Sequence, residues 1–222
     1  MSEPLPCDAV VLELWKGPVV DANMDERQSF FDDAAATWDE LPERGLWRER
    51  LGKLVARFEV RKGDAILDVG TGTGILLPLL GKAIGPEGSL VAMDFSYKML
   101  AAAASRGFDR QPVFFNAGVA AIPFKRGSFD KVTCFSAFPH FPDKVKALAE
   151  MVRVLKEGGG LFIAHLHSIE EINQLHHAVG GPVMADRLPD RETMERLMKD
   201  AGLTKIEIEN EPGRFLASGR RH

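Results

Sequence analysis

Residues 66–74 carry the residue types whose spacing most directly suggests chemistry. They read Ile-Leu-Asp-Val-Gly-Thr-Gly-Thr-Gly, an apolar run that contains Asp68 and leads into three alternating glycines. Glycine is used where the backbone turns with a positive φ or approaches a ligand closely, and Gly70, Gly72 and Gly74 would supply such a bend between a strand and a helix. The pattern predicts a loop where a nucleoside lies against bare backbone. An ordinary glycine-rich turn is the alternative.

The spacing of these glycines distinguishes between two classes of nucleotide-binding loop. The dinucleotide fingerprint GxGxxG needs a third glycine where this chain has Ile75, so the chain departs from that pattern. The spacing GxGxG, preceded by Asp68, resembles instead the first motif of class I S-adenosylmethionine (AdoMet) dependent methyltransferases. The resemblance implies that Asp68 lies near the methionine amino group of AdoMet. It also implies that the methionine and ribose parts are held by Gly70, Thr71, Gly72, Thr73 and Gly74.

Further stretches resemble the later motifs of this family and follow in the same order. Asp94 stands twenty residues after Gly74, where a carboxylate can accept hydrogen bonds from both ribose hydroxyls, as it would in a dehydrogenase. The residues after Asp94 separate the two classes. By resemblance, Phe95, Ser96 and Met99 belong to the segment over adenine, Asn116, Ala117 and Gly118 to the third motif, and Ser136 and Ala137 to the floor of the site.

Asn116 departs from the family pattern, which usually has aspartate there to receive the adenine amino group. Asparagine can still accept a hydrogen bond through its carbonyl oxygen, but without the charge of a carboxylate. Selectivity for adenine would then rest on a neutral acceptor. If the side chain faces away from the cofactor, Asn116 is a plain residue at a strand end.

An upstream stretch at 30–39, Phe-Phe-Asp-Asp-Ala-Ala-Ala-Thr-Trp-Asp, resembles one common in methyltransferases of the ubiquinone/menaquinone biosynthesis type. The resemblance spans residues 30 to about 218. It implies that Phe31 and Trp38 shield the sulfonium from water. It also implies transfer of a methyl group from AdoMet to a small-molecule acceptor by direct displacement, and it leaves that acceptor unspecified.

Histidines are the candidate catalytic groups, because imidazole titrates near neutrality and also binds metals. Five of the six histidines fall in one region, and we select His140, which follows the predicted fourth strand, and His165 and His167, which lie at and just beyond the end of the fifth. On an extended strand, His165 and His167 would share a face. The alternatives are core or surface histidines. No HExxH or CxxC spacing supports a metal site, and none is expected.

Short apolar runs alternate with helical periods from residue 64 onward, as in a parallel sheet covered on both faces. We expect an α/β fold: a Rossmann-like, doubly wound, seven-stranded sheet with an antiparallel C-terminal hairpin and an N-terminal helical lid. The expected strands are 65–69, 89–94, 113–116, 129–136, 161–166, 205–210 and 214–219. The expected helices are 76–83, 96–106 capped by Ser96, 143–156 stopped by the glycines at 158–160, and 191–201 capped by Asp190.

The chain is expected to divide into a lid segment and one domain. Residues 1–60 hold all three tryptophans and read as helices and loops over the carboxyl edge of the sheet, and residues 61–222 form the methyltransferase domain. An insertion-like cap at about 168–190 would choose the substrate. Its polar residues predict either an acceptor pocket or a solvated amphipathic helix: Glu171, Asn173, His176 and Asp186.

Composition limits the partners and the location. The 222 residues suit one α/β domain, and a net charge of −4 disfavours nucleic acid as a partner. Cys7 and Cys134 are too few and too unlike in context for a disulfide framework, which fits a reducing cytoplasm. No apolar run reaches the roughly 18 to 20 residues that cross a bilayer, and the first residues lack an export signal. Association into a homodimer is left open.

Two other functions compete with catalysis. The first is a binding module that senses AdoMet or its product without transferring a methyl group. The second is a metal-binding or tetrapyrrole-binding protein that uses the histidine cluster. Methylation of nucleic-acid amines is disfavoured because that subclass needs a polar-Pro-Pro-aromatic loop, and this chain reads Ser-Ala-Phe-Pro from Ser136 onward.

Overall fold

The computed structural model describes residues 13–14, 22–40, 47–109 and 111–222. Cys7, Trp15 and part of the expected lid segment lie outside these ranges.

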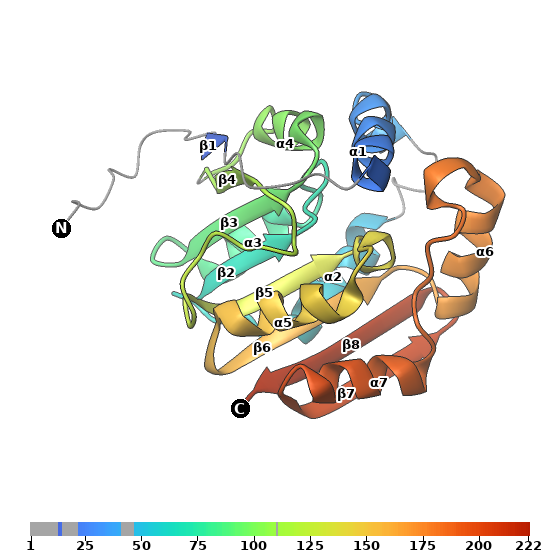
Figure 1. The fold of residues 1–222 in the computed structure, drawn as a ribbon. Coiled ribbons are helices and arrows are strands. Elements are labelled where there is room, and N and C mark those ends of the chain that lie inside the picture. The colour runs from blue at the N-terminus through green and yellow to red at the C-terminus, as the bar shows by residue number, and fades with distance from the viewer. Residues whose placement is uncertain (1–12, 15–21, 41–46, 110) are drawn as a thin grey trace.

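The described strands form one sheet in the order β1-β4-β3-β2-β5-β6-β8-β7 (Figure 1). The strands from β1 to β6 pair in parallel, whereas β8 runs antiparallel to both β6 and β7. The predicted seven-stranded Rossmann-like sheet with its C-terminal hairpin is confirmed, and the two residues of β1 extend it at the β4 edge. The bounds are β1 Glu13–Leu14, β2 Ala65–Val69, β3 Ser89–Asp94, β4 Val113–Asn116, β5 Phe129–Phe135, β6 Leu155–His165, β7 Leu203–Glu211 and β8 Arg214–Arg221.

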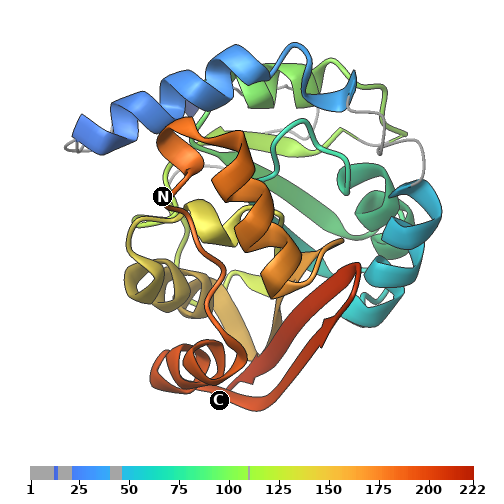
Figure 2. The same cartoon turned by 90° about the vertical axis from the view of Figure 1, so that its right-hand side faces the viewer.

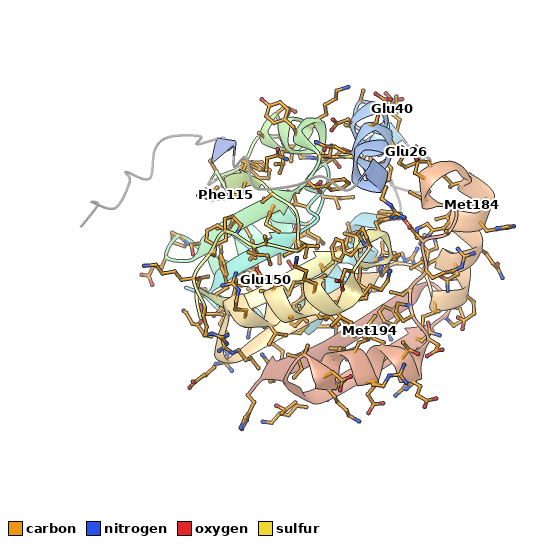
Figure 3. All side chains as sticks on the ribbon, in the orientation of Figure 1. Glu26, Glu40, Phe115, Glu150, Met184 and Met194 are labelled. Atoms are coloured by element: carbon orange, nitrogen blue, oxygen red, sulfur yellow. The ribbon has the colours of Figure 1, made fainter. Side chains whose placement is uncertain are left out.

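Helices cover both faces of the sheet, because alternate residues of the parallel strands are apolar in both directions. Leu67 belongs to the core beneath α5 and α7, and Ile66 belongs to the core beneath α2, α3 and α4. Figure 3 labels Glu150 on α5 and Met194 on α7, which lie on the first of these faces. The helices are α1 Ala22–Ala34, α2 Trp47–Val55, α3 Leu77–Ile84, α4 Tyr97–Ala104, α5 Lys144–Val154, α6 Ile169–Val179 and α7 Arg191–Asp200. Short 3₁₀ turns are η1 Trp38–Glu40, η3 Ala56–Phe58, η4 Phe138–His140 and η5 Gly181–Val183.

Side-chain caps begin the helices where the sequence predicts them. Ser96 accepts a hydrogen bond from the amide of Met99, and Asp190 accepts one from the amide of Thr193. Each cap satisfies one of the amides that a helix leaves without a partner in its first turn. The predicted caps of α4 and α7 are therefore confirmed.

The expected end of the helix at 143–156 is wrong. Helix α5 ends at Val154, and the buried Leu155 already has extended backbone and pairs with Phe129 as the first residue of β6. The glycines at 158–160 lie inside β6, where the pairing register shifts between Phe129 and Lys131. Burial of Leu155 against the sheet ends the helix before the glycines are reached.

The described part of the N-terminal segment packs in two places. Helix α2 contributes to the core of the sheet through Trp47, Leu51 and Leu54. Helix α1 lies against α4 and η5 and, together with α6, over the carboxyl edge of the parallel strands (Figure 2). The boundary at residue 60 and the cap at 168–190 stay predictions.

Gly74 allows the loop after β2 to pack closely on α3 and α4. Its φ is +77°, and an added Cβ would lie 2.8 Å from Leu77 Cδ1 and 3.0 Å from Ala103 Cβ. We expect Gly74→Ala to lower the free energy of unfolding by about 2 kcal/mol, through left-handed strain and overpacking. Urea denaturation measures this loss. The matched control is Gly52→Ala on α2, where a Cβ meets nothing within 4 Å and alanine favours the helix. Equal stability of both variants would contradict the packing described here.

Candidate functional site

The carboxyl ends of β2 to β6 meet at the edge of the sheet that α1 and α6 cover (Figures 1 and 2). In open α/β sheets this edge is where ligands bind. In Figure 3, Glu26 marks α1 and Met184 marks the segment after η5, the two elements that meet there. The candidate side chains come from the strand ends, from α1 and from this cap.

Asp68 lies at the end of β2 and is 2% exposed. One carboxylate oxygen accepts a hydrogen bond from the hydroxyl of Thr71 at 2.7 Å, and the other accepts one from the hydroxyl of Thr133 at 2.6 Å. Burial raises the pKa of Asp68 to about 6, although both hydroxyls favour the charged form. A cationic ligand group would restore full ionisation.

Asp94 holds the glycine loop to the start of α4. Its carboxylate accepts hydrogen bonds from the amide of Gly72 at 2.8 Å and from the amide of Ser96 at 2.9 Å. Burial raises the pKa of Asp94 to about 6, opposed by these two amides and reinforced by the charge of Asp68. Two carboxylates of high proton affinity therefore flank the same loop.

The glycine loop touches the loop after β5 at Gly70 and leaves open space at Gly72. An added Cβ at Gly70 would lie 2.4 Å from the Cβ of Ala137, so this glycine lets the loop after β2 touch the loop after β5. Ser136 has a φ of +54°, which is uncommon for a residue with a side chain and is typical of functional sites. At Gly72 an added Cβ would meet nothing within 4 Å. The surface of the loop at Gly72 is open.

Asn116 has a structural task that aspartate could not perform. Its side-chain amide nitrogen donates hydrogen bonds to the carbonyl oxygens of Asp94 and Phe95, at 3.0 and 2.9 Å. The amide of Ala117 also donates to the carbonyl oxygen of Asp94, at 3.0 Å. A carboxylate at position 116 would place negative charge against two carbonyl oxygens. The departure from the family pattern thus ties the end of β4 to the end of β3 and leaves the side-chain oxygen as an acceptor.

Phe31 is the centre of an aromatic cluster at the edge of the sheet. Its ring centroid lies 5.6 Å from Phe95, 5.9 Å from Trp38 and 5.1 Å from His140, all edge to face. Met99 packs in the same apolar cluster. The predicted aromatic shield and the predicted adenine segment are thus brought together.

Asp32 and Asp39 join α1 and η1 to the loops after β2 and β3, a role that was not predicted from the sequence. Asp32 accepts a hydrogen bond from the hydroxyl of Ser96, and Asp39 accepts one from the hydroxyl of Thr73 at 2.8 Å and pairs with Arg106. Both acids stand in the stretch at 30–39 that also carries Phe31 and Trp38. The resemblance of that stretch to known methyltransferases was the sequence signal from which a role for these two acids could have been predicted.

His140 stands in a network of side chains from three elements. Its Nδ1 lies 2.6 Å from one carboxylate oxygen of Asp186, and the other oxygen is 2.6 Å from the guanidinium of Arg27. Nδ1 of His176 lies 3.1 Å from the carbonyl oxygen of Asp186. His140 is thus held at the site together with two polar residues of the cap.

The structure separates His165 from His167, and the expectation that they share a face is wrong. Strand β6 ends at His165, whose ring packs on Phe215 in one core, whereas His167 leaves the strand and lies near Trp47, which belongs to the opposite core. Burial holds the pKa of His165 well below its usual value, and its Nε2 has no hydrogen-bond partner. His165 is therefore neutral and fully buried behind the site.

Two of the polar cap residues serve the fold. Glu171 accepts hydrogen bonds from the amides of Ser168 and Gly213, and Asn173 exchanges hydrogen bonds with the backbone of Leu188. Only His176 and Asp186 join the network of His140. Within the described ranges, no three His, Cys, Asp or Glu side chains gather as metal ligands would.

Known proteins share this sequence pattern and fold. A family described as "Methyltransferase domain" matches residues 67–163. The chain is 29% identical to the ubiquinone/menaquinone biosynthesis C-methyltransferase of Francisella philomiragia, over 84% of this chain and 86% of that protein. It is 27% identical to the demethylmenaquinone methyltransferase of Lactococcus lactis, over 88% and 89%. An AdoMet-dependent methyltransferase from Aquifex aeolicus has the same fold, with a TM-score of 0.61 and 22% identity over 85% of this chain and 96% of that one.

The strand order, the antiparallel hairpin and the glycine loop between two buried carboxylates fit an enzyme that uses AdoMet to methylate small molecules, the class that the sequence comparisons support. Sequence similarity narrows that class. The chain matches the methyltransferase-domain family over residues 67–163 and is similar to methyltransferases of the ubiquinone/menaquinone type. It is an enzyme with AdoMet as its cofactor, and the non-catalytic and metal-binding alternatives are set aside. None of the described helices is long and apolar enough to cross a membrane.

The open surface at Gly72 allows a substitution that tests ligand contact with little effect on packing. We expect Gly72→Val to abolish AdoMet binding in calorimetric titration, because the added side chain would fill the open space at this loop in which we place the cofactor. The left-handed φ of +55° adds strain of roughly 1–2 kcal/mol, which a thermal melt measures separately. Wild-type affinity in a folded Gly72→Val protein would contradict the placement of the cofactor on this loop.

Proposed function

We propose that this enzyme transfers the methyl group to a ring carbon of a hydroxylated aromatic acceptor of the hydroquinone class. The observation that carries the proposal is His140, an imidazole whose Nδ1 is engaged by Asp186 and whose ring lies 5.1 Å from Phe31. A base beside an aromatic wall suits an acceptor that is flat and must lose a hydroxyl proton. The relatives named as a ubiquinone/menaquinone biosynthesis C-methyltransferase and a demethylmenaquinone methyltransferase support the same acceptor class.

The proposed cofactor site fits the residues present. Asp68 would face the methionine ammonium, Asp94 would accept from the ribose hydroxyls, and the remainder of the loop would lie along the ligand at Gly72. These roles suit two buried carboxylates, whose pKa values burial raises, and a backbone surface with no neighbour within 4 Å. AdoMet supplies an electrophilic methyl group on a sulfonium. The proposed contacts to adenine and the methyl donor come from Phe31, Trp38, Phe95, Met99, Asn116 and Gly118.

Proton transfer to His140 would activate the acceptor. Nε2 would take the proton of the ring hydroxyl and so move electron density to the adjacent ring carbon, which would take the methyl group of the sulfonium and release the thioether S-adenosylhomocysteine. The imidazolium would then return its proton to the ring oxygen, and the freed imidazole would accept the proton of the methylated carbon, which restores the aromatic ring. General base catalysis contributes about 10²- to 10⁴-fold in rate, and alignment of the two reactants lowers the barrier by roughly 7–11 kcal/mol. Phe31 and Trp38 would keep water from the reacting atoms.

The proposal includes a location and partners. A reducing cytoplasm suits Cys134, a free thiol that is fully buried in the core. The net charge of −4 argues against a nucleic-acid partner. All residues proposed for the site come from one chain. Association into a homodimer would therefore be compatible with this site.

An acceptor assay tests the reaction class. The purified enzyme is incubated with AdoMet and either a naphthohydroquinone kept reduced or an aromatic amine of similar size. We expect S-adenosylhomocysteine to form only with the hydroquinone, and NMR of the product to show a methyl group on carbon. A methyl group on oxygen or nitrogen, or equal turnover of the amine, would refute the proposed acceptor.

Replacement of His140 by Gln is expected to lower kcat by about 10²- to 10⁴-fold.

The raised pKa of Asp68 predicts opposite effects of pH on AdoMet binding and on stability. An ammonium ligand needs the ionised carboxylate, so AdoMet affinity should fall as the pH drops from 7 through about 6, by at most about tenfold per unit for one proton. In the ligand-free protein the folded-state pKa of about 6 exceeds the usual 3.8, so the stability contributed by this group is present at low pH and lost as the pH rises through about 6.

Calorimetric titrations in buffers of different ionisation enthalpy measure the proton release that accompanies binding near pH 6. Asp68→Asn should remove that release. An affinity independent of pH between 5 and 7 would place the ammonium away from Asp68.

A further inference from the structure

Asp186 is a buried carboxylate that both the lid and the loop after β5 engage. It is 5% exposed, and its two oxygens are divided between His140 and Arg27, each at 2.6 Å. Its main-chain carbonyl oxygen faces Nδ1 of His176 on α6. A buried carboxylate with both oxygens engaged has one fixed orientation.

Arg27 joins the lid to both members of this pair. One of its terminal nitrogens reaches Asp186, and the other donates to the main-chain carbonyl oxygen of His140 at 3.1 Å. Arg27 is on α1, which is held over the site by packing of Phe31 on Val183 and by the hydrogen bond between Ser96 and Asp32. Arg27 therefore clamps the histidine–carboxylate pair from α1, by contacting both residues at once. This clamp requires α1 to lie against the cap.

The surrounding charges keep Asp186 ionised. Burial alone would raise the pKa of Asp186, but hydrogen bonds from His140 and Arg27 outweigh burial and lower it. From α5, Lys144 donates to the carbonyl oxygens of Pro139 and Phe141 and places a positive charge near Asp186. Other ionisable groups around the pair are His176 on α6, Arg187 on the cap and His165 at the end of β6.

We propose that Asp186 is a positioning residue for the base His140, and that Arg27 completes the arrangement when the lid closes. This rests on the proposed function, in which His140 takes a proton from the acceptor. An anionic carboxylate accepts a hydrogen bond, so in the neutral imidazole Nδ1 carries the hydrogen and Nε2 presents its lone pair. Closure of α1 therefore coincides with the tautomer and ring orientation that removal of a proton requires.

The tautomer can be measured in the unmodified enzyme. Nitrogen-15 NMR distinguishes protonated from unprotonated ring nitrogens, and the His140→Gln spectrum assigns the signals of His140. We expect hydrogen on Nδ1 and a lone pair on Nε2. Hydrogen on Nε2 in the neutral form overturns the proposal without reference to any variant of Asp186.

Asp186→Asn tests the kinetic consequence. The amide can donate to Nδ1 and so favours the wrong tautomer, and we expect kcat to fall by about 10²-fold. The KM of the hydroquinone and the calorimetric Kd of AdoMet should stay within about twofold, a split that loss of the cap structure would not produce. The matched control is Asp190→Asn, an exposed helix cap four residues further along that asparagine also serves.

Arg27→Met tests the clamp. It should lower kcat in the wild-type background and add little in the Asp186→Asn background, because both changes remove the same arrangement. Additive losses, or wild-type kcat in Asp186→Asn while His140→Gln is impaired, overturn the positioning role. Wild-type kcat in His140→Gln would instead show that the proposed base is wrong.

Discussion

Burial of two carboxylates at the ends of adjacent strands is the constraint on which this site depends. Asp68 and Asp94 are 2% and 6% exposed, and a charged group out of water is costly unless hydrogen bonds compensate. The compensation comes from the loops themselves: hydroxyls of Thr71 and Thr133 for one, amides of Gly72 and Ser96 for the other. Ionisation of the acids and conformation of the loops are therefore linked. A cationic ligand at this edge would supply positive charge that the hydrogen bonds of the fold only partly replace.

The lid is attached to the same loops. Ser96 donates to Asp32 of α1 while its own amide donates to Asp94, and Thr73 donates to Asp39. The position of α1 over the site thus depends on hydrogen bonds to the loops that carry the proposed cofactor contacts. From α1 the polar contacts continue through Arg27 to the cap and to His140. The proposed cofactor site, the lid and the proposed base are therefore linked by one continuous series of contacts. A change in one of them can alter the geometry of the other two.

The sequence predicts the sheet and the glycine loop well, because strand patterning and glycine spacing are local signals. It places the end of α5 wrongly, because burial of Leu155 in the core overrides the stop signal of the glycines. It places His165 and His167 on one face because it does not show that β6 ends at His165. It gives no role to Arg27 and does not pair Asp186 with His140, because these residues are distant in the chain and meet only through tertiary packing.

The position of Asp186 on the cap joins acceptor choice to chemistry. Glu171 and Asn173 hold the cap to the hairpin and to its own backbone, which leaves Asp186 and His176 to face the loop after β5. If the carboxylate that orients the proposed base His140 lay on the sheet, the imidazole would have the same orientation with every acceptor. Because it lies on the cap and is clamped from the lid, an acceptor that prevents α1 from seating also separates Arg27 from Asp186. In the proposed function, discrimination would then act on the rate of proton removal as well as on binding, and α1 would exclude water at the same step.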